Sequence, residues 1–143
     1  MIVLKDGIGV LIFLIINTSL LVGLVYWLVR RERLLHSFAP RINPSRVPEH
    51  LRPFIPLAAK FGIGDDGIRY DVASAAPVEE KRQLREVFDF RSEDIDQWID
   101  SFGDEPMSDE AAAFMYMLLA TDELTAFGDP IFSYQASPVD HDS

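Results

Sequence analysis

No segment narrows the possible structures of this chain more than Ile8 to Val29, a run of 22 residues without a formal charge. As an α-helix it would be about 33 Å long, enough to cross a hydrocarbon layer of about 30 Å. Fifteen of its residues are Leu, Ile, Val or Phe, and each favours membrane insertion by roughly 0.3 to 0.6 kcal/mol. The run therefore predicts a transmembrane helix whose surroundings are a lipid bilayer.

Two other interpretations of this run fit its length and ends less well. The apolar region of a cleaved signal peptide spans about 7 to 15 residues and is followed by small residues, whereas Tyr26, Trp27 and two arginines close this run. A buried core helix would need a large soluble core around it, and the remainder of the chain has no matching apolar segment. We expect an uncleaved, single membrane span.

Basic residues are concentrated on one side of the run, which predicts its orientation. Three arginines follow it directly, while the short N-terminal tail offers only Lys5 beside Asp6. The positive-inside rule then puts the C-terminal side in the cytoplasm, and aromatic residues mark the same boundary. The predicted membrane-interface residues are Tyr26, Trp27, Arg30, Arg31 and Arg33. We expect a single-pass protein of the plasma (inner) membrane, with its N-terminus outside and its C-terminal domain cytoplasmic.

Polar and small residues inside the run are candidates for association between helices. Ser19 and Gly23 form a small-xxx-small pair, and Asn17 lies near the middle of the span. Such residues allow close helix packing and interhelical hydrogen bonds in membranes. The alternative is that Asn17 bonds within its own helix and that the small residues have no partner, because both are common in membrane helices.

The residues after the run divide the chain further. The helix is expected to continue to Phe38, and prolines then interrupt helical structure repeatedly between Pro40 and Pro56. We interpret this stretch as a semi-rigid stalk. The predicted organisation is a short N-terminal tail (1–7), a transmembrane helix (8–29), a basic collar and Pro-rich linker (30–52), an acidic helical domain (53–127) and a disordered tail (128–143).

The acidic domain shows no period-2 alternation, so the predicted fold class is all-α, with four or five short helices after the span. The clearest amphipathic pattern is the i, i+3, i+4, i+7 series from Ile95 to Phe102. The first predicted helix begins at Pro53 or Pro56 and ends at Gly62, and the second runs from Asp65 or Asp66 to Ala75. The third runs from Pro77 to Phe90. The fourth begins after a cap at Ser92, and the last begins after a cap at Ser108.

The last of these helices is apolar on more than one face. It is therefore either the central helix of the domain or a partly exposed one. Phe114, Met115 and Met117 are the candidate partner-binding residues if it is exposed, because Met- and Phe-rich faces adapt to different ligands. The core interpretation is the more common one for such a helix.

Charge and composition argue against several classes of function. Residues 53–143 carry six basic and twenty acidic residues, a net charge of −14, which disfavours nucleic acid as a partner. The chain has no cysteine, so disulfides, thiolate nucleophiles and cysteine-based zinc sites are excluded. The three histidines are too far from the domain's other polar groups in sequence to suggest a catalytic or metal site.

Two motifs with possible chemistry have simpler explanations. Gly62 to Gly67 lacks the spacing of a dinucleotide loop, and as a calcium loop it would lack three oxygen ligands. The segment is typical of a helix end followed by a helix start. Glu93, Asp96 and Asp100 share one helix face but lie opposite its apolar stripe, which indicates a solvated surface. We therefore expect no enzymatic activity, no cofactor and no metal.

The leading hypothesis is a membrane-anchored acidic helical interaction module of the adaptor, inhibitor or immunity type, which binds a basic cytoplasmic protein partner. One alternative is a small accessory subunit of a membrane complex, which acts through homo- or hetero-association of its transmembrane helix. A weaker alternative is a carboxylate-dependent metal hydrolase.

Overall fold

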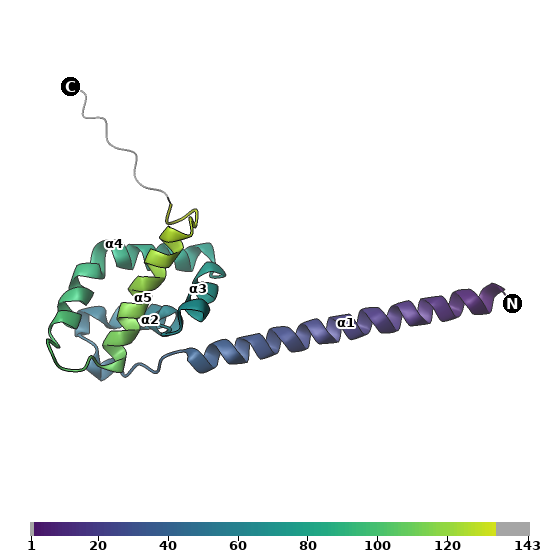
Figure 1. Ribbon diagram of the computed structural model, residues 1–143, viewed down its shortest axis with the longest axis horizontal. Coiled ribbons are helices and arrows are strands. Elements are labelled where there is room, and N and C mark those ends of the chain that lie inside the picture. The colour runs from purple at the N-terminus through teal and green to yellow at the C-terminus, as the bar shows by residue number, and fades with distance from the viewer. Residues whose placement is uncertain (1, 134–143) are drawn as a thin grey trace, which may run out of the picture. The chain divides into compact units, whose positions relative to one another are not determined.

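The computed structural model describes residues 2–133, without the side chains of residues 2–6 and 34–36, and it contains only helices over that range (Figure 1). The all-α prediction is confirmed for these residues. The α-helices are α1 (Ile2–Phe38), α2 (Ile55–Phe61), α3 (Asp66–Ser74), α4 (Val78–Asp100) and α5 (Asp109–Ala126), and the 3₁₀ turns are η1 (Pro44–Arg46) and η2 (Glu49–Phe54). The chain forms two units, α1 and a folded unit that begins at Phe38.

The first unit is one uninterrupted helix that is long and apolar enough to cross a membrane. Its segment Gly7–Arg33 has a mean hydropathy of 2.6, and none of this segment is buried against other residues. The core-helix interpretation is therefore wrong, because a core helix would be mostly covered. The helix also continues past the apolar run to Phe38, as its sequence predicts.

The folded unit is built around α5, which packs against α4, α2 and α3 and crosses between them in Figure 1. Ala111, Ala113 and Ala120 are fully or almost fully buried along α5. Because these side chains are small, the neighbouring helices can approach the α5 backbone closely. Phe114 fills the space beside them and meets the Trp98 ring edge-on, at 5.5 Å between centroids. The core prediction for α5 is confirmed.

The segment before α2 belongs to the folded unit, so the prediction of a stalk is wrong. Val47 and Leu51 are 2% and 0% exposed and lie in the same core as α5. The prolines shape the two 3₁₀ turns that bring these apolar residues inward. The backbone N–H of Asn43 also donates to Glu110 Oε1 at 3.2 Å. Sequence reasoning gave weight to the prolines and overlooked the apolar residues between them.

Helix α4 replaces two predicted helices by one continuous helix of 23 residues, so the predicted break at Ser92 is wrong. No proline or glycine occurs within it. Leu84 and Ile95, both fully buried, are eleven residues apart, which is close to three turns of an α-helix. The apolar stripe therefore stays in register across Ser92, and continuing the helix keeps both halves against the core.

The predicted helix ends are confirmed at three positions. Asp65 caps α3, accepting a hydrogen bond from the Ile68 N–H at 2.9 Å. Ser108 caps α5, accepting one from the Ala111 N–H at 3.2 Å. Gly62 follows α2 as its C-cap. Side-chain caps satisfy backbone donors that have no partner within the helix, so local sequence is sufficient to locate them.

Residues 129–133 fold back onto the core, which corrects the predicted disorder for this part of the tail. Phe132 is 7% exposed and half-buried Ile131 packs beside it. Lys81 pairs with Asp129 at 2.6 Å, and Arg85 donates to the Ile131 carbonyl. Two basic residues of α4 thus hold this turn in place. Residues 134–143 of the predicted tail lie outside the described residues.

Candidate functional site

Every lysine and arginine from residue 53 to residue 133 lies in an ion pair with an acidic side chain. The pairs are Lys60–Glu80, Arg69–Glu123, Lys81–Asp129, Arg82–Glu79, Arg85–Asp89 and Arg91–Asp94. No lysine or arginine follows Arg91 in the chain. The positive charge of the folded unit after residue 52 is therefore fully matched, and the remaining carboxylates have no counter-charge from this segment.

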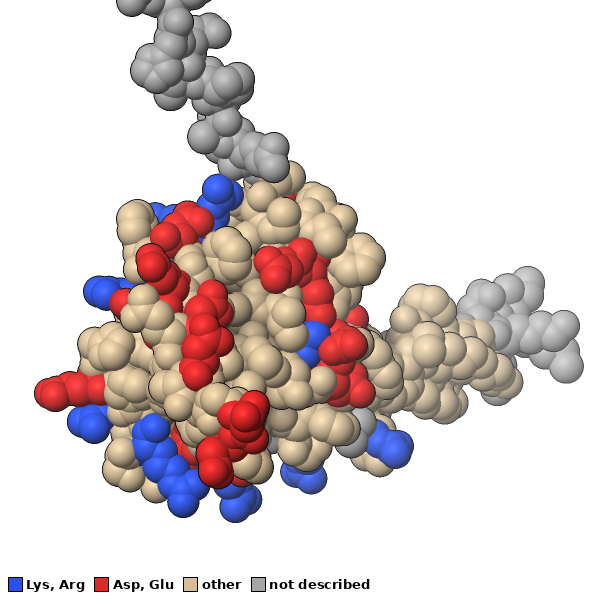
Figure 2. Space-filling model, turned by 60° about the vertical axis from the view of Figure 1, so that its left-hand side comes forward, with Lys and Arg blue, Asp and Glu red and all other residues tan. Residues whose placement is uncertain are grey.

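The unmatched carboxylates are concentrated on the C-terminal half of α4 and the turn after it. We call this set the acidic surface, and it consists of Glu93, Asp96, Asp100, Asp104 and Glu105. All five are exposed, and none forms an ion pair with another described residue. Figure 2 shows acidic side chains spread over the visible face of the folded unit, with most basic side chains toward its edge.

The acidic surface occupies the end of α4 where negative charge is least favourable. Helix dipoles favour carboxylates at the N-terminus and disfavour them at the C-terminus, by about 0.3 to 1 kcal/mol per group. Glu79 and Glu80 in the first turn of α4 follow this rule. Asp100, the last residue of α4, breaks it, and no basic residue occupies the last turn to compensate. The dipole of α4 therefore gives Asp100 no stabilising role in the fold.

A second surface feature is a groove of about 650 Å³ between α4 and the segment η2–α2, here called the α2–α4 groove. Buried Val87 and half-buried Phe54 and Leu57 provide its apolar lining. Phe90 also lines the groove, although its side chain is 77% exposed. A volume of this size falls within the range of known ligand and peptide sites, about 300 to 1,000 Å³.

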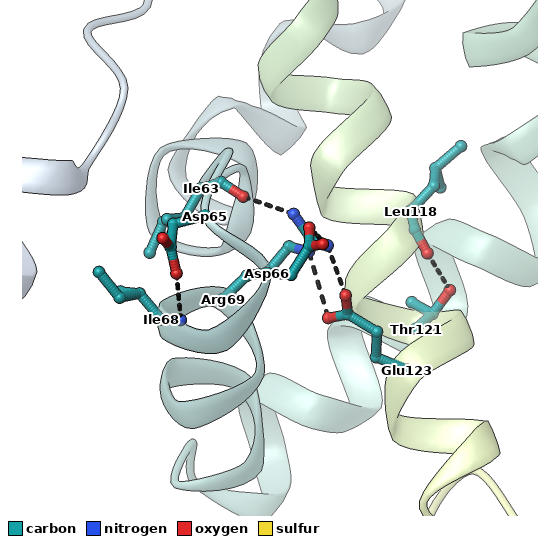
Figure 3. Close-up of polar contacts among 8 residues, drawn as sticks. All are labelled: Ile63, Asp65, Asp66, Ile68, Arg69, Leu118, Thr121 and Glu123. Carbon is teal, nitrogen blue, oxygen red and sulfur yellow. Dashed lines mark hydrogen bonds and ion pairs between the residues drawn. The ribbon is translucent and has the colours of Figure 1, made fainter.

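The most buried charged group has a structural role. Arg69 is 2% exposed and binds Glu123 of α5 through two nitrogens, the Ile63 carbonyl at 2.8 Å and Asp66 at 2.7 Å (Figure 3). Its guanidinium also lies 5.5 Å from the centroid of the Tyr116 ring. One side chain therefore joins the α2–α3 loop, α3 and α5.

Arg69 keeps its positive charge at physiological pH. Burial alone would lower the pKa of its guanidinium, but the hydrogen bonds and charges of Glu123 and Asp66 outweigh it, so the pKa is raised. A group whose folded-state pKa is raised contributes stability that is complete below its ordinary pKa and is lost only as pH rises through the raised one. For an arginine this window lies far above neutral pH, so the protonation of Arg69 is no physiological switch.

The residues predicted as a partner surface on α5 do not form one. Phe114 and Met117 are both 0% exposed, and Met115 is half-buried. The exposed-surface prediction is therefore wrong for Phe114 and Met117. The physical reason is that α5 is covered by three helices, so it can be apolar around most of its circumference without meeting water.

The polar residues of α1 between residues 7 and 33 are all exposed on that helix. The Asn17 side-chain amide donates to the Phe13 carbonyl at 2.8 Å, as the local alternative requires. No atom lies within 4 Å of a Cβ added at Gly23, so this position is open to a neighbouring helix. Association through Asn17, Ser19 and Gly23 stays a prediction, as does the role of Tyr26 and of Arg30 and Arg33 at a membrane interface. The Arg31 guanidinium lies 5.5 Å from the centroid of the Trp27 ring.

Three carboxylates were considered above as possible catalytic or metal-binding groups. Glu93, Asp96 and Asp100 are exposed, as expected for a solvated helix face. Among the described residues, no three His, Asp or Glu side chains form a group that could hold a metal ion. The other notable carboxylate is Glu110, which is 4% exposed and whose Oε2 has no hydrogen-bond partner. Arg46 lies 4.0 Å from it, and the N-terminal turn of α5 favours its charge.

Sequence reasoning missed two of these features. The α2–α4 groove joins residues that are about thirty positions apart, so no local pattern reveals it. The exposure of Phe90 could have been suspected, because Leu84, Val87 and Phe88 already account for the inward face of that helix segment. The acidic surface was visible in the sequence as a stretch without lysine or arginine, but only the ion pairs show that it is uncompensated.

No family model matches this chain, and no curated protein or solved structure is similar to it. The acidic surface and the α2–α4 groove are the two surface features described above. They have different chemistry, since one is charged and the other is largely apolar.

Proposed function

We propose that this chain is a membrane-anchored interaction module whose acidic surface binds a basic protein partner in the cytoplasm. The observation that carries the proposal is the complete pairing of lysines and arginines from residue 53 to residue 133, which leaves the five carboxylates of the acidic surface unmatched. Exposed charge of one sign attracts an oppositely charged partner and accelerates encounter.

Helix α1 supports the membrane part of the proposal. It has the length and hydropathy of a span, and its basic flank predicts that the folded unit is cytoplasmic. An anchored module meets its partner near the membrane surface, where the partner's basic groups would also be drawn to anionic lipid. The acidic surface would then compete with the lipid for the same basic groups.

The first prediction concerns the anchor. We expect the full-length protein to remain in the membrane pellet after a carbonate wash, because transferring α1 to water would expose its apolar side chains. The chain has no cysteine, so a Gln97→Cys variant has a single reactive thiol. A membrane-impermeant maleimide should label this thiol only after the cells are lysed, whereas a cysteine added at the N-terminus should react in intact cells.

Either part of this prediction can fail on its own. Recovery of the protein in the carbonate-soluble fraction would show that α1 does not span the bilayer. Labelling of Gln97→Cys in intact cells would show that the protein spans it in the opposite orientation, with the acidic surface outside.

The second prediction concerns the acidic surface. We expect the triple variant Asp96→Asn, Asp100→Asn, Asp104→Asn to bind its basic partner about tenfold more weakly at low salt, because three attractive charges are lost. The same variant should be slightly more stable than the parent, since the charge of Asp100 opposes the α4 dipole. Solubilised full-length protein would be used to capture partners from cytoplasmic extract, with mass spectrometry to identify them.

A matched control distinguishes an effect of the acidic surface on binding from an effect of the overall net charge. The variant Asp71→Asn, Asp122→Asn, Glu49→Gln removes the same number of exposed carboxylates elsewhere and should retain the partner. Equal loss of binding in both variants would mean that overall charge is sufficient and no defined surface exists. Binding that resists high salt in the parent would contradict an electrostatic interface altogether.

A further inference from the structure

The α2–α4 groove combines an apolar recess with an exposed aromatic side chain on the same patch. Its apolar lining, from Phe54 and Leu57 on one side and Val87 on the other, forms a recess. Phe90 lines the same groove and is 77% exposed, so most of its ring is in contact with solvent. An exposed aromatic side chain next to an apolar recess can fill the same recess on a second molecule.

The charges around the groove are balanced, unlike those of the rest of the domain. Its lining includes Lys60 and Arg91 together with Glu80 and Glu86, which sum to zero. Lys60 pairs with Glu80, and Arg91 lies 6.0 Å from the centroid of the Phe54 ring while it pairs with Asp94. A two-fold contact places a patch against its own copy, and a patch with equal numbers of positive and negative charges carries no net charge to repel that copy.

The same argument disfavours the acidic surface as a contact between copies. The acidic surface of one copy would repel that of another, because like charges oppose close approach. The groove instead carries equal numbers of basic and acidic side chains, and an apolar anchor is exposed beside them. Burying a large aromatic at the centre of a contact is typical of the residues that dominate binding energy.

We propose that the α2–α4 groove is a self-association surface, in which Phe90 of each copy enters the groove of the other about a two-fold axis. Anchoring in a membrane would raise the effective concentration of one copy for another and make a modest contact sufficient. The acidic surface begins after Arg91, so a dimer of this kind would carry two such surfaces. The inference does not require the basic partner to exist.

Cross-linking of the full-length protein in membranes tests this directly. Gln83 is exposed and lines the groove, and Gln83→Cys supplies the only thiol in the chain. We expect a short bismaleimide to link two copies through this thiol. Adding Phe90→Ser should reduce the linked fraction about tenfold or more, because the apolar anchor is lost.

Val78→Ser is the matched control, since Val78 is a 68% exposed apolar residue of the same helix that does not line the groove. It should leave the linked fraction unchanged. Both Phe90 and Val78 are exposed, so neither change should unfold the domain, which circular dichroism can check. Three results would overturn the proposal: a monomer throughout, equal linking with and without Phe90, or links from residue 83 to a different protein.

A further variant distinguishes self-association through the groove from self-association through α1. Gly23→Leu closes the open position on α1 and would weaken any contact made by that helix. Linking that survives Gly23→Leu and fails with Phe90→Ser supports the groove. The reverse pattern would assign self-association to α1 and would contradict this inference, while leaving the proposed binding of a basic partner untouched.

Discussion

Gly62→Ala should lower the free energy of unfolding of the folded unit by about 3 kcal/mol, although it adds a single methyl group. A Cβ at this position would lie 2.3 Å from the Ala58 carbonyl oxygen and 2.4 Å from the Ala113 carbonyl oxygen. Both atoms belong to backbone, so no side chain can move aside to make room. Helices α2 and α5 would have to separate, which would open the core around Phe61 and Phe114.

This expectation does not arise from backbone strain at Gly62. Its φ is −77°, a value that any residue adopts. A urea titration of the full-length protein in mild detergent would measure the effect. Trp98 serves as the reporter in a Trp27→Phe background, because its ring packs against Phe114 in the core.

Gly67→Ala is the matched control for Gly62→Ala. A Cβ at Gly67 would meet only Asp65 Oδ1, at an ordinary contact distance of 3.5 Å. Because Gly67 lies in the first turn of α3, replacing it by alanine should leave stability within about 1 kcal/mol of the parent, on the stabilising side. Similar destabilisation by both substitutions would contradict the close approach of α2 to α5 at Gly62.

Arg69→Met is expected to lower the free energy of unfolding by about 3 kcal/mol. The substitution keeps much of the side-chain volume but removes the only cation that pairs with Glu123 among the described residues, and the donor to the Ile63 carbonyl. The Glu123 side chain is 21% exposed. Leaving a carboxylate and a carbonyl unpaired in a largely buried site is the main penalty. Asp66 is 85% exposed and should contribute little. The same Trp98 titration measures the effect.

Two further variants test the cause. Arg69→Met with Glu123→Leu should recover most of the loss, because replacing both members of a buried ion pair by apolar residues is often neutral. Arg82→Met removes an exposed arginine from its pair with Glu79 and should change stability by less than about 1 kcal/mol. If the double variant were as unstable as Arg69→Met alone, the unpaired Glu123 would not be the reason.

These two residues stabilise the same junction from different sides. Gly62 lets α2 reach the N-terminal part of α5, and Arg69 ties α3 and the intervening loop to its C-terminal part. The acidic surface takes part in neither contact. Its carboxylates can therefore be changed with little effect on folding, which is the property that allows the proposed binding experiments to be interpreted.

The features that the sequence predicted correctly depend on neighbouring residues. The length and hydropathy of the run from Ile8 to Val29 are enough to specify a membrane-length helix. The caps at Asp65 and Ser108 bond to backbone groups three residues away. The all-α class likewise follows from apolar spacing within single helices. Each of these signals is contained within a few turns of chain, so it can be read without knowing the tertiary structure.

Tertiary structure alone decided the features that join distant residues. It placed Val47 and Leu51 in the core rather than in a stalk, and it continued α4 across Ser92 because both halves pack on one core. It also explains why residue 62 is a glycine. The local sequence identifies Gly62 only as a helix end, whereas the Ala113 backbone, about fifty residues away, leaves no room for a Cβ at this position. Burial and ion pairing depend on which helices meet, and neighbouring residues in a sequence carry little information about that choice.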